Sequence, residues 1–405
     1  MAAQHRRCRR WPVYVAAGFL ASAALVPGVG HAVGAEAEEA TQPVPTTPVP
    51  TSPATTATVV PPALPVPLAP QPAVGAYLDY SFRGVALMAG LSRWLGGAEL
   101  RVGHTYLPGD RWSNIEGAPR FLDSWAAWRR ERDDRMLVLN VPMLERNEEA
   151  VSDAEVRALL RRGAAGEYDA HFRRLAERLV ELRVPDTVLV LGWEMNGTTY
   201  THRCGPDPQA WKAYWNRIVT TMRSVPGQRF RFDFTPSRGR DAVPWNECYP
   251  GDDTVDIIGM DAYDQPQGMS FDEQVTEPYG LQQHVDFAKE HGKPISYPEW
   301  GLFRNGDNAE YMRGMLAWFD QHKPLYHTIT DYCPHGVWRC RQNPRAAAVY
   351  RSVLPSTTAP LPLPVPKPQP EPVPLPRPNC SPLELGDWME YWLGGRLCFR
   401  FDWWS

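Results

Sequence analysis

Two glutamates each follow a short apolar run that is typical of a buried strand. Leu189–Gly192 leads through Trp193 to Glu194, and Ile295–Pro298 leads directly to Glu299. Hydrolysis of a glycosidic bond usually requires two carboxyl groups, and retaining enzymes hold them about 5 to 5.5 Å apart. The two glutamates therefore predict glycosidase chemistry, provided that the fold brings the ends of these strands together.

The segment around the glutamates alternates short β-rich runs with longer amphipathic runs, of which 169–182 is an example. Eight strands, most of them followed by helices, predict an α/β fold of the (β/α)8 TIM-barrel type over residues 74–355. The active site of such a barrel lies at the carboxyl ends of the strands. An open doubly wound sheet would alternate similarly, but no glycine-rich phosphate loop follows the first strand. The predicted strands are 74–80, 99–105, 136–141, 187–193, 229–235, 255–260, 294–298 and 327–332, and the predicted helices include 169–182, 208–224 and 274–291.

Two further motifs accompany the glutamates, which end the fourth and seventh predicted strands. Gly163–Asp169 leads into the helix before strand four, and Tyr249–Tyr263 runs through strand six. Together with the strand ends, these motifs resemble glycoside hydrolase family 26, the β-mannanase family of the retaining (β/α)8 clan. The resemblance covers most of residues 75–353.

The resemblance implies roles for five residues. Glu194 would be the general acid/base and Glu299 the nucleophile. Tyr263, at the end of strand six, would hydrogen-bond Glu299 and keep it ionised. Asp261 and Asn196 would border the sugar site.

Three further side chains are candidates for substrate contact. Trp193 is expected to form an apolar wall, which favours the neutral form of an adjacent acid. Trp300 is expected to form a sugar platform, the alternative being packing beneath the site. His104, after strand two, either lines the cleft or caps a loop.

The chain departs from the family pattern at three places. Trp193 stands where family members carry histidine, Thr198–His202 replaces a stretch with cleft-lining tryptophans, and Asp331–Tyr332 replaces a tryptophan at the end of strand eight. The catalytic pair is therefore better supported than specificity for mannan. A mixed-linkage glucan, a xylan or an envelope polysaccharide remains an alternative substrate.

The first 35 residues have the order of a secretory signal peptide. The basic stretch His5–Arg10 precedes the apolar run Val13–Val29, and small-residue cleavage sites follow at 30–32 and 33–35. We therefore expect secretion of the protein, with no membrane span once residues 1–35 are removed. An uncleaved amino-terminal anchor is the alternative.

Composition divides the rest of the chain. Residues 36–73 form a Pro/Thr-rich linker and 356–379 a Pro-rich linker, both of a composition that favours extended spacers. Residues 380–405 form a small aromatic segment, which would either contact polysaccharide or cell wall or pack on the barrel. Its aromatic residues include Trp388, Tyr391, Trp392, Phe399, Phe401, Trp403 and Trp404.

Six cysteines follow the leader, and an even number in an exported chain favours disulfides. The sequence does not fix their pairing. We expect Cys204–Cys248, Cys333–Cys340 and Cys380–Cys398, the last stapling the small aromatic segment. A zinc cluster around Cys333 lacks a second paired ligand motif.

Charge and the paired glutamates narrow the function. Removing the four arginines of residues 1–35 lowers the formal net charge from −4 to −8, which argues against a nucleic acid partner. With these glutamates, the resemblance to family 26 implies a secreted retaining endo-β-glycosidase that cleaves a β-linked polysaccharide, most simply a β-mannan, without a cofactor or metal. The alternative is a non-catalytic polysaccharide-binding barrel, although binding alone does not need a matched acid and nucleophile.

Overall fold

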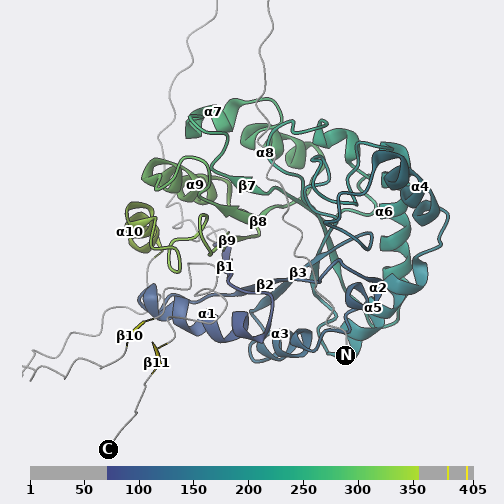
Figure 1. The fold of residues 1–405 in the computed structure, drawn as a ribbon, viewed down its shortest axis with the longest axis horizontal. Helices are drawn as coiled ribbons and strands as arrows, with labels where there is room; N and C mark the ends of the chain where they lie inside the picture. The colour runs from purple at the N-terminus through teal and green to yellow at the C-terminus, as the bar shows by residue number, and fades with distance from the viewer. Residues whose placement is uncertain (1–70, 355–380, 383–397, 400–405) are drawn as a thin grey trace, which may run out of the picture. The chain divides into compact units, whose positions relative to one another are not determined.

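The computed structural model describes residues 71–354 and, in backbone only, the pairs 381–382 and 398–399. Within residues 71–354, eight parallel strands close into a barrel that is surrounded by helices (Figure 1). The predicted (β/α)8 fold is therefore confirmed. The barrel strands are β1 (Ala73–Tyr77), β2 (Val102–Tyr106), β3 (Met136–Val141), β4 (Val188–Leu191), β5 (Arg231–Phe234), β6 (Ile257–Gly259), β8 (Ile295–Gly301) and β9 (Tyr326–Thr330).

Hydrogen bonds between neighbouring strands close the barrel into a complete ring. Strand β1 pairs with β2 and with β9, and β6 pairs with β8, so the eight strands leave no free edge. The sixth barrel strand is interrupted at Met260 and Asp261. It resumes as β7 (Ala262–Tyr263), which pairs with the end of β8 and places Tyr263 opposite Gly301.

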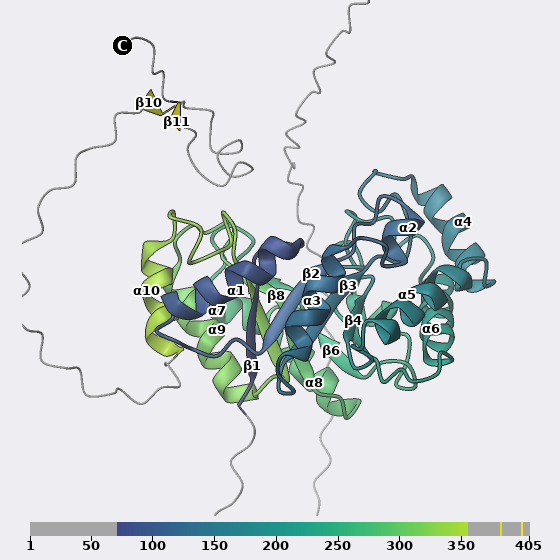
Figure 2. The same ribbon diagram turned by 90° about the horizontal axis from the view of Figure 1, so that it is seen from below.

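Every predicted strand overlaps an observed one, and the third agrees at both ends. The outer layer consists of helices that pack on the strands, for example α3 beside β2 and β3 (Figure 2). The helices are α1 (Phe82–Trp94), α2 (Trp112–Ile115), α3 (Phe121–Arg130), α4 (Asp153–Ala164), α5 (Asp169–Glu181), α6 (Pro208–Arg223), α7 (Phe271–Thr276), α8 (Leu281–Glu290), α9 (Ala309–His322) and α10 (Pro344–Val353), with a 3-10 turn η1 (Trp245–Cys248).

Helix α6 shows how the sequence specifies this layer. The side chain of Asp207 accepts a hydrogen bond from the Ala210 amide, and Pro208 occupies the first turn, where its missing N–H costs nothing. Trp211 and Trp215, four residues apart, lie on the buried face. The predicted helix 208–224 is thus confirmed to within one residue.

The predicted single helix 274–291 was wrong, because the chain forms α7 and α8 with a break between them. Pro278 has no backbone N–H to continue a helix, and a proline also disfavours helical geometry in the preceding residue. Glu277 is accordingly extended, with ψ 154°. Gly280 then precedes the first residue of α8.

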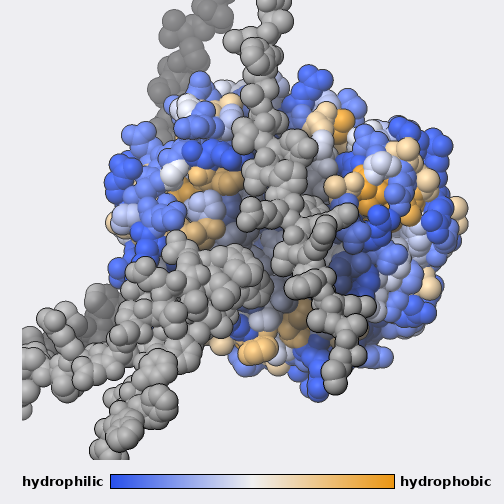
Figure 3. All heavy atoms as spheres, in the orientation of Figure 1, coloured by the Kyte–Doolittle hydropathy of each residue, from blue (hydrophilic) through white to orange (hydrophobic). Residues whose placement is uncertain are grey.

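Two apolar cores sandwich the barrel wall. Alternate strand residues point inward and pack together inside the barrel, while their neighbours pack against the helices. The face of the domain that is visible in Figure 3 is mostly hydrophilic, with small apolar patches. The inward-facing core includes Val102, Val138, Val188, Val190, Ile257 and Tyr326.

Two disulfides tie loops of the barrel. Cys204–Cys248 joins the loop before α6 to η1, and Cys333–Cys340 closes the loop after β9, as expected for both pairs. The expected Cys380–Cys398 bond lies outside the described residues, as do the leader 1–35 and nearly all of the segments 36–73, 356–379 and 380–405. Ser381–Pro382 (β10) pairs with Cys398–Phe399 (β11) in antiparallel fashion. Among the helices of the described ranges, none has the length and apolar character needed to cross a membrane.

Candidate active site

Glu299 points into the barrel because strand β8 is irregular just before it. Ser296 faces inward and donates a hydrogen bond to Asp233, whereas Trp300 faces outward and contacts Phe319 of α9. Residues four apart would share a face in a regular strand. The register shift between Tyr297 and Trp300 reverses this alternation and turns Glu299 inward.

Three donors hold the carboxylate of Glu299. The Asn140 side-chain amide donates to Oε1 at 3.1 Å, and the Tyr263 hydroxyl donates to Oε2 at 2.8 Å. A hydrogen bond from Tyr106 adds a third. Burial raises the pKa of Glu299, and these three hydrogen bonds oppose the rise because they favour the charged form. The expected contact of Tyr263 with Glu299 is therefore present.

A second chain of contacts orients Asn140. His104 lies buried on β2, and its Nε2 is 2.8 Å from the amide oxygen of Asn140. Burial lowers the pKa of His104 to about 4, so the ring is neutral at ordinary pH. Because an amide oxygen only accepts, Nε2 carries the proton and the Asn140 NH2 group turns toward Glu299. His104 thus neither lines a cleft nor caps a loop, and both expectations for it were wrong.

Glu194 follows β4 through a tight turn. Gly192 has φ 58°, and a Cβ at this position would lie 2.4 Å from the sulfur of Met143. Glu194 also adopts a left-handed conformation, with φ 50°, while its amide donates to the Thr235 carbonyl at 2.8 Å. Its side chain stays half-buried. Such a conformation is unfavourable outside glycine and is typical of functional positions.

The two glutamates are electrostatically coupled. Burial first, and then the charge of Glu299, raise the pKa of Glu194 to about 8, while hydrogen bonds from Ser237 and Tyr200 lower it. With its three donors, Glu299 is the member of the pair that ionises first. At neutral pH the arrangement holds one protonated and one ionised carboxyl group, the pair of states that glycoside hydrolysis needs.

Asp261 forms the third carboxyl group of the site. It lies between β6 and β7, is buried, and accepts a hydrogen bond from the Glu299 backbone amide but from no side chain of the described residues. Burial, followed by the charges of Glu299 and Glu194, raises its pKa well above the usual range. Burial and the neighbouring carboxyl groups therefore favour the protonated form of Asp261.

Asn196 acts as a brace. Its side-chain amide donates to the Ser237 carbonyl at 3.1 Å and its oxygen accepts from the Ser237 amide at 2.9 Å. Ser237 in turn contacts Glu194. Asn196 is fully buried and fixes the loop after β5, so its expected place at the edge of the sugar site was wrong.

The two tryptophans next to the glutamates are not open platforms. Trp193 is 4% exposed and packs among Tyr106, Tyr200 and His202, which fits the expected apolar wall beside Glu194. Trp300 is fully buried between the barrel and its helices, where it contacts Phe319, His327 and Tyr350. The expected platform role of Trp300 was wrong, because adjacent strand residues face opposite sides and Glu299 already faces inward.

Half-buried tyrosines surround the carboxyl groups instead. Tyr77 contacts Tyr106 and Tyr332, and His335 contacts Tyr263 at 4.7 Å between ring centres. Sequence reasoning missed Tyr77, Tyr106 and His335, together with Asn140. One signal was available for Asn140, which is the only polar residue of Met136–Val141. In the described ranges, no three acidic, histidine or cysteine side chains are grouped to hold a metal ion.

Comparison with known proteins supports this reading of the barrel. Residues 165–321 match the model of glycosyl hydrolase family 26, a stretch that begins after α4, ends within α9 and contains Glu194, Tyr263 and Glu299. No curated protein sequence matches the chain.

Solved structures match over most of the barrel. The YdhT protein from Bacillus subtilis has a TM-score of 0.53 at 17% identity, covering 71% of this chain and 86% of that one. The catalytic domain of a family 26 endo-β-1,4-mannanase from Bacillus sp. JAMB-750 has a TM-score of 0.53 at 16% identity, with 70% and 87% covered. A family 26 β-mannanase from Bacteroides ovatus has a TM-score of 0.50 at 15% identity, with 64% and 80% covered. At these identities, the likeness establishes the fold.

Proposed function

We propose that this glycoside hydrolase, whose residues 165–321 match the family 26 model, hydrolyses β-mannan with retention of anomeric configuration. Glu299 is the nucleophile and Glu194 the general acid/base. Two neighbours of similar fold are β-mannanases, which supports mannan as the first substrate to test. The main support for this proposal is the difference between the two glutamates. Glu299 accepts from three donors, whereas Glu194 has a pKa of about 8.

In the first step, an oxygen of Glu299 bonds to the anomeric carbon while the glycosidic bond breaks. The proton of Glu194 moves to the departing sugar oxygen, so the leaving group departs as an alcohol. Tyr263, Asn140 and Tyr106 keep Glu299 ionised until it attacks. As Glu299 loses its charge, the pKa of Glu194 falls, because that charge is one cause of its rise.

In the second step, Glu194 is ionised and acts as a base. It takes a proton from water, whose oxygen attacks the anomeric carbon and displaces the Glu299 carboxylate. The enzyme returns to its starting protonation, and the product keeps the β configuration. Asp261, whose raised pKa favours the protonated form, would offer its carboxyl group to a sugar hydroxyl.

A reducing-end assay of the purified chain against mannans, glucans and xylans tests the substrate, with Glu299→Ala as the blank. Release from mannan, followed by NMR detection of a β-configured first product, is the expected result. Release from another polymer alone would replace the substrate, and an α-configured first product would replace the mechanism. If no polymer is hydrolysed, the alternative of a non-catalytic polysaccharide-binding barrel is favoured.

We also propose that the enzyme acts outside the cell. Two disulfides in the barrel support this, since disulfides are rare in reducing compartments. The order of residues 1–35 supports it independently. Processing at 30–35 and recovery of the enzyme from the medium are the expected observations. Retention of residues 1–35 with the cell fraction would instead favour the anchor.

The aromatic segment 380–405 is proposed to hold the enzyme on insoluble polysaccharide or cell wall. Its support is compositional, namely the aromatic residues that suit stacking on sugar rings. Deleting residues 356–405 should lower retention on insoluble mannan while leaving hydrolysis of soluble oligosaccharides unchanged. Loss of the soluble activity would indicate packing on the barrel.

A further inference from the structure

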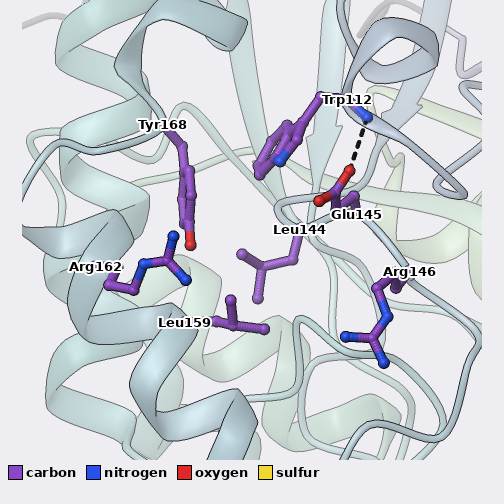
Figure 4. A pocket seen from close by; sticks show the side chains of 7 residues that line it. All are labelled: Trp112, Leu144, Glu145, Arg146, Leu159, Arg162 and Tyr168. Atoms are coloured by element: carbon purple, nitrogen blue, oxygen red, sulfur yellow. Dashed lines mark hydrogen bonds between the residues drawn. The ribbon is translucent and has the colours of Figure 1, made fainter.

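Arg238 lies in the loop after β5, and its charged group is buried. The side chain is 4% exposed and forms an ion pair with Glu277. Arg146 and Arg162, which line a small cavity of about 100 Å³ (Figure 4), also pair with acidic residues, but their side chains are 44% and 53% exposed. Removing a charge from water is costly, so the contacts that Arg238 makes in the interior must offset that cost.

These contacts hold the segment that carries Asp261 and Tyr263. The backbone amide of Arg238 donates to the Asp261 carbonyl at 2.9 Å. Its Nη2 atom donates to the Tyr263 carbonyl at 3.3 Å and also to the Gln265 carbonyl. One residue of the β5 loop therefore fixes the backbone on both sides of strand β7.

Strand β7 needs such support because, within the described barrel, it pairs with a strand on one side only. That partner is the end of β8, where Tyr263 lies opposite Gly301. On the other side, parallel pairing stops at an isolated bridge between Ser237 and Asp261. Carbonyl groups beyond the end of a neighbouring strand still need donors. The guanidinium group of Arg238 supplies them at the place where a strand would otherwise continue.

Glu277 keeps the guanidinium group in this position. It directly follows α7 at the break before α8, and its side chain is 19% exposed. A backbone contact joins the same two loops, since the Gly239 amide donates to the Tyr279 carbonyl at 2.9 Å. The break between α7 and α8 thus places an acidic partner beside Arg238.

The other end of Tyr263 contacts the nucleophile of the proposed reaction. Its hydroxyl group lies 2.8 Å from Oε2 of Glu299 and 2.8 Å from the hydroxyl oxygen of Thr330. A movement of the Tyr263 backbone moves this hydroxyl group, and hydrogen bonds weaken steeply when their distance and angle leave the favourable range. The contacts of Arg238 with the backbone therefore bear on the contact with Glu299.

We propose that Arg238 is a positioning residue for the nucleophile, because it holds the backbone of Tyr263 and thereby keeps the Tyr263 hydroxyl group on Glu299. The inference rests on the proposed function, in which Glu299 attacks the anomeric carbon. Arg238 acts through Tyr263 and not on the substrate. This route distinguishes it from a residue that only stabilises the fold.

Arg238→Lys tests the proposal with the charge retained. Lysine can keep the ion pair with Glu277, but its ammonium group lacks the planar fork that reaches two carbonyl groups and a carboxylate together. Arg135→Lys is the matched control. Arg135, just before β3, is 18% exposed, donates to the Trp128 carbonyl and pairs with Glu131.

A double-mutant cycle with Tyr263→Phe measures the coupling through kcat/KM on manno-oligosaccharides. Tyr263→Phe should lower kcat/KM about 10- to 100-fold, because it removes a hydrogen bond to a charged group. Arg238→Lys should lower it about fivefold in the wild-type chain and less than about twofold in the Tyr263→Phe background. Arg135→Lys should change neither background. An equal loss from Arg238→Lys in both backgrounds would overturn the proposal.

A titration that needs no turnover keeps this proposal separable from the proposed function. Carbon-13 NMR of labelled glutamate carboxyl groups follows Glu299, whose signal is assigned from Glu299→Gln. The hydrogen bond from Tyr263 opposes the rise in the pKa of Glu299 that burial causes, so Arg238→Lys should raise this pKa. Arg135→Lys should leave it unchanged.

The ionisable groups that interact with Glu299 are the same in both lysine variants. They are the carboxyl groups of Glu194 and Asp261 and the hydroxyl groups of Tyr106 and Tyr263. A change in the titration of Glu299 that appears only in Arg238→Lys is therefore assigned to the position of Tyr263.

A paired variant covers the case in which Arg238→Lys does not fold. Arg238→Gln with Glu277→Gln leaves no unpaired buried charge, and it should raise the pKa of Glu299 in the same way. An unchanged Glu299 pKa in a folded variant at Arg238 would overturn the proposal. Failure of the proposed function would appear separately, as no turnover of manno-oligosaccharides by the wild-type chain, and the titration would still test Arg238.

Discussion

Buried carboxyl groups occur at two depths inside the barrel, and their surroundings differ. Asp233, on β5, accepts hydrogen bonds from the hydroxyl groups of Thr235, Ser296 and Tyr326 at 3.0, 2.6 and 2.6 Å. At the carboxyl ends of the strands, Asp261 accepts from the Glu299 backbone amide but from no side chain of the described residues, and burial and the charge of Glu299 raise the pKa of Glu194. Hydroxyl donors surround the carboxylate of Asp233, whereas charged neighbouring carboxyl groups raise the pKa values of Glu194 and Asp261.

The contrast separates a structural acid from a reactive one. Burial raises the pKa of Asp233 as it does those of Glu194 and Asp261. A raised pKa therefore does not identify a catalytic group in this molecule. What distinguishes the catalytic end is an ionised carboxylate whose charge raises the pKa values of two other carboxyl groups.

The largest effect should come from Glu299→Gln. The amide cannot form the covalent glycosyl bond, so kcat/KM on mannan should fall on the order of 10⁴-fold or more. The thermal unfolding midpoint should fall, because the amide NH2 cannot accept from all three donors, but the chain should stay folded, because the amide keeps the size of the side chain. Initial rates and a melting curve on the same preparation measure both quantities. Residual activity within tenfold of the wild type would mean that Glu299 is not the nucleophile.

The next largest effect should come from Glu194→Ala. Loss of the proton donor should cost about 10² to 10⁴-fold on substrates with poor leaving groups. Substrates with activated leaving groups need less protonation, so their glycosyl-enzyme should form and then accumulate. Added azide should accelerate its breakdown and give a β-glycosyl azide, identified by NMR. An α-azide would contradict a double-displacement reaction.

A smaller effect should appear in the dependence of activity on pH. Glu194 must be protonated in the free enzyme, and its pKa is about 8. The value of kcat/KM should therefore fall with rising pH, approaching tenfold per unit well above 8. In the Glu194→Ala variant, the alkaline limb should disappear on activated substrates. Persistence of the limb in that variant would assign it to another group.

The same shift should affect stability. The folded state binds the Glu194 proton more tightly than the unfolded state, in which the pKa of this carboxyl group is near 4.5. This contribution is fully present below pH 4.5 and is lost as pH rises through about 8. Because Glu194 is half-buried, water screens part of the effect.

The contrast between the two regions also shows how far the sequence could predict the site. Glu194 and Glu299 were predictable because each follows a clear apolar run, and Tyr263 because its motif resembles that of the family. Tyr106 and Asn140 lie on β2 and β3, so only closure of the barrel reveals that they face Glu299. Contacts that cross a barrel leave no pattern in local sequence.

The errors have local physical causes. The sequence gives no sign of the register shift in β8 before Trp300. This shift turns Glu299 inward and Trp300 outward, so the side that Trp300 faces could not be predicted from alternation alone. Asn196 was misplaced because a buried amide can brace a loop as readily as bind a sugar. The break between α7 and α8 was readable, since Pro278 stands within the predicted helix.

The smallest effect on activity should come from Asp233→Asn, and this variant tests the contrast most directly. Three hydroxyl groups donate to the carboxylate, and an amide NH2 cannot accept from them. At least one buried hydroxyl then loses its partner, which should lower the free energy of unfolding by about 1 to 3 kcal/mol. Chemical denaturation measures this loss, and Asp320→Asn on the exposed face of α9 is the control. The kcat/KM of the folded fraction should stay near wild type, because the catalytic end keeps its own donors. A large loss of kcat/KM with unchanged stability would mean that Asp233 is electrostatically coupled to the catalytic carboxyl groups. In that case, Asp233 would help to set the protonation of Glu299.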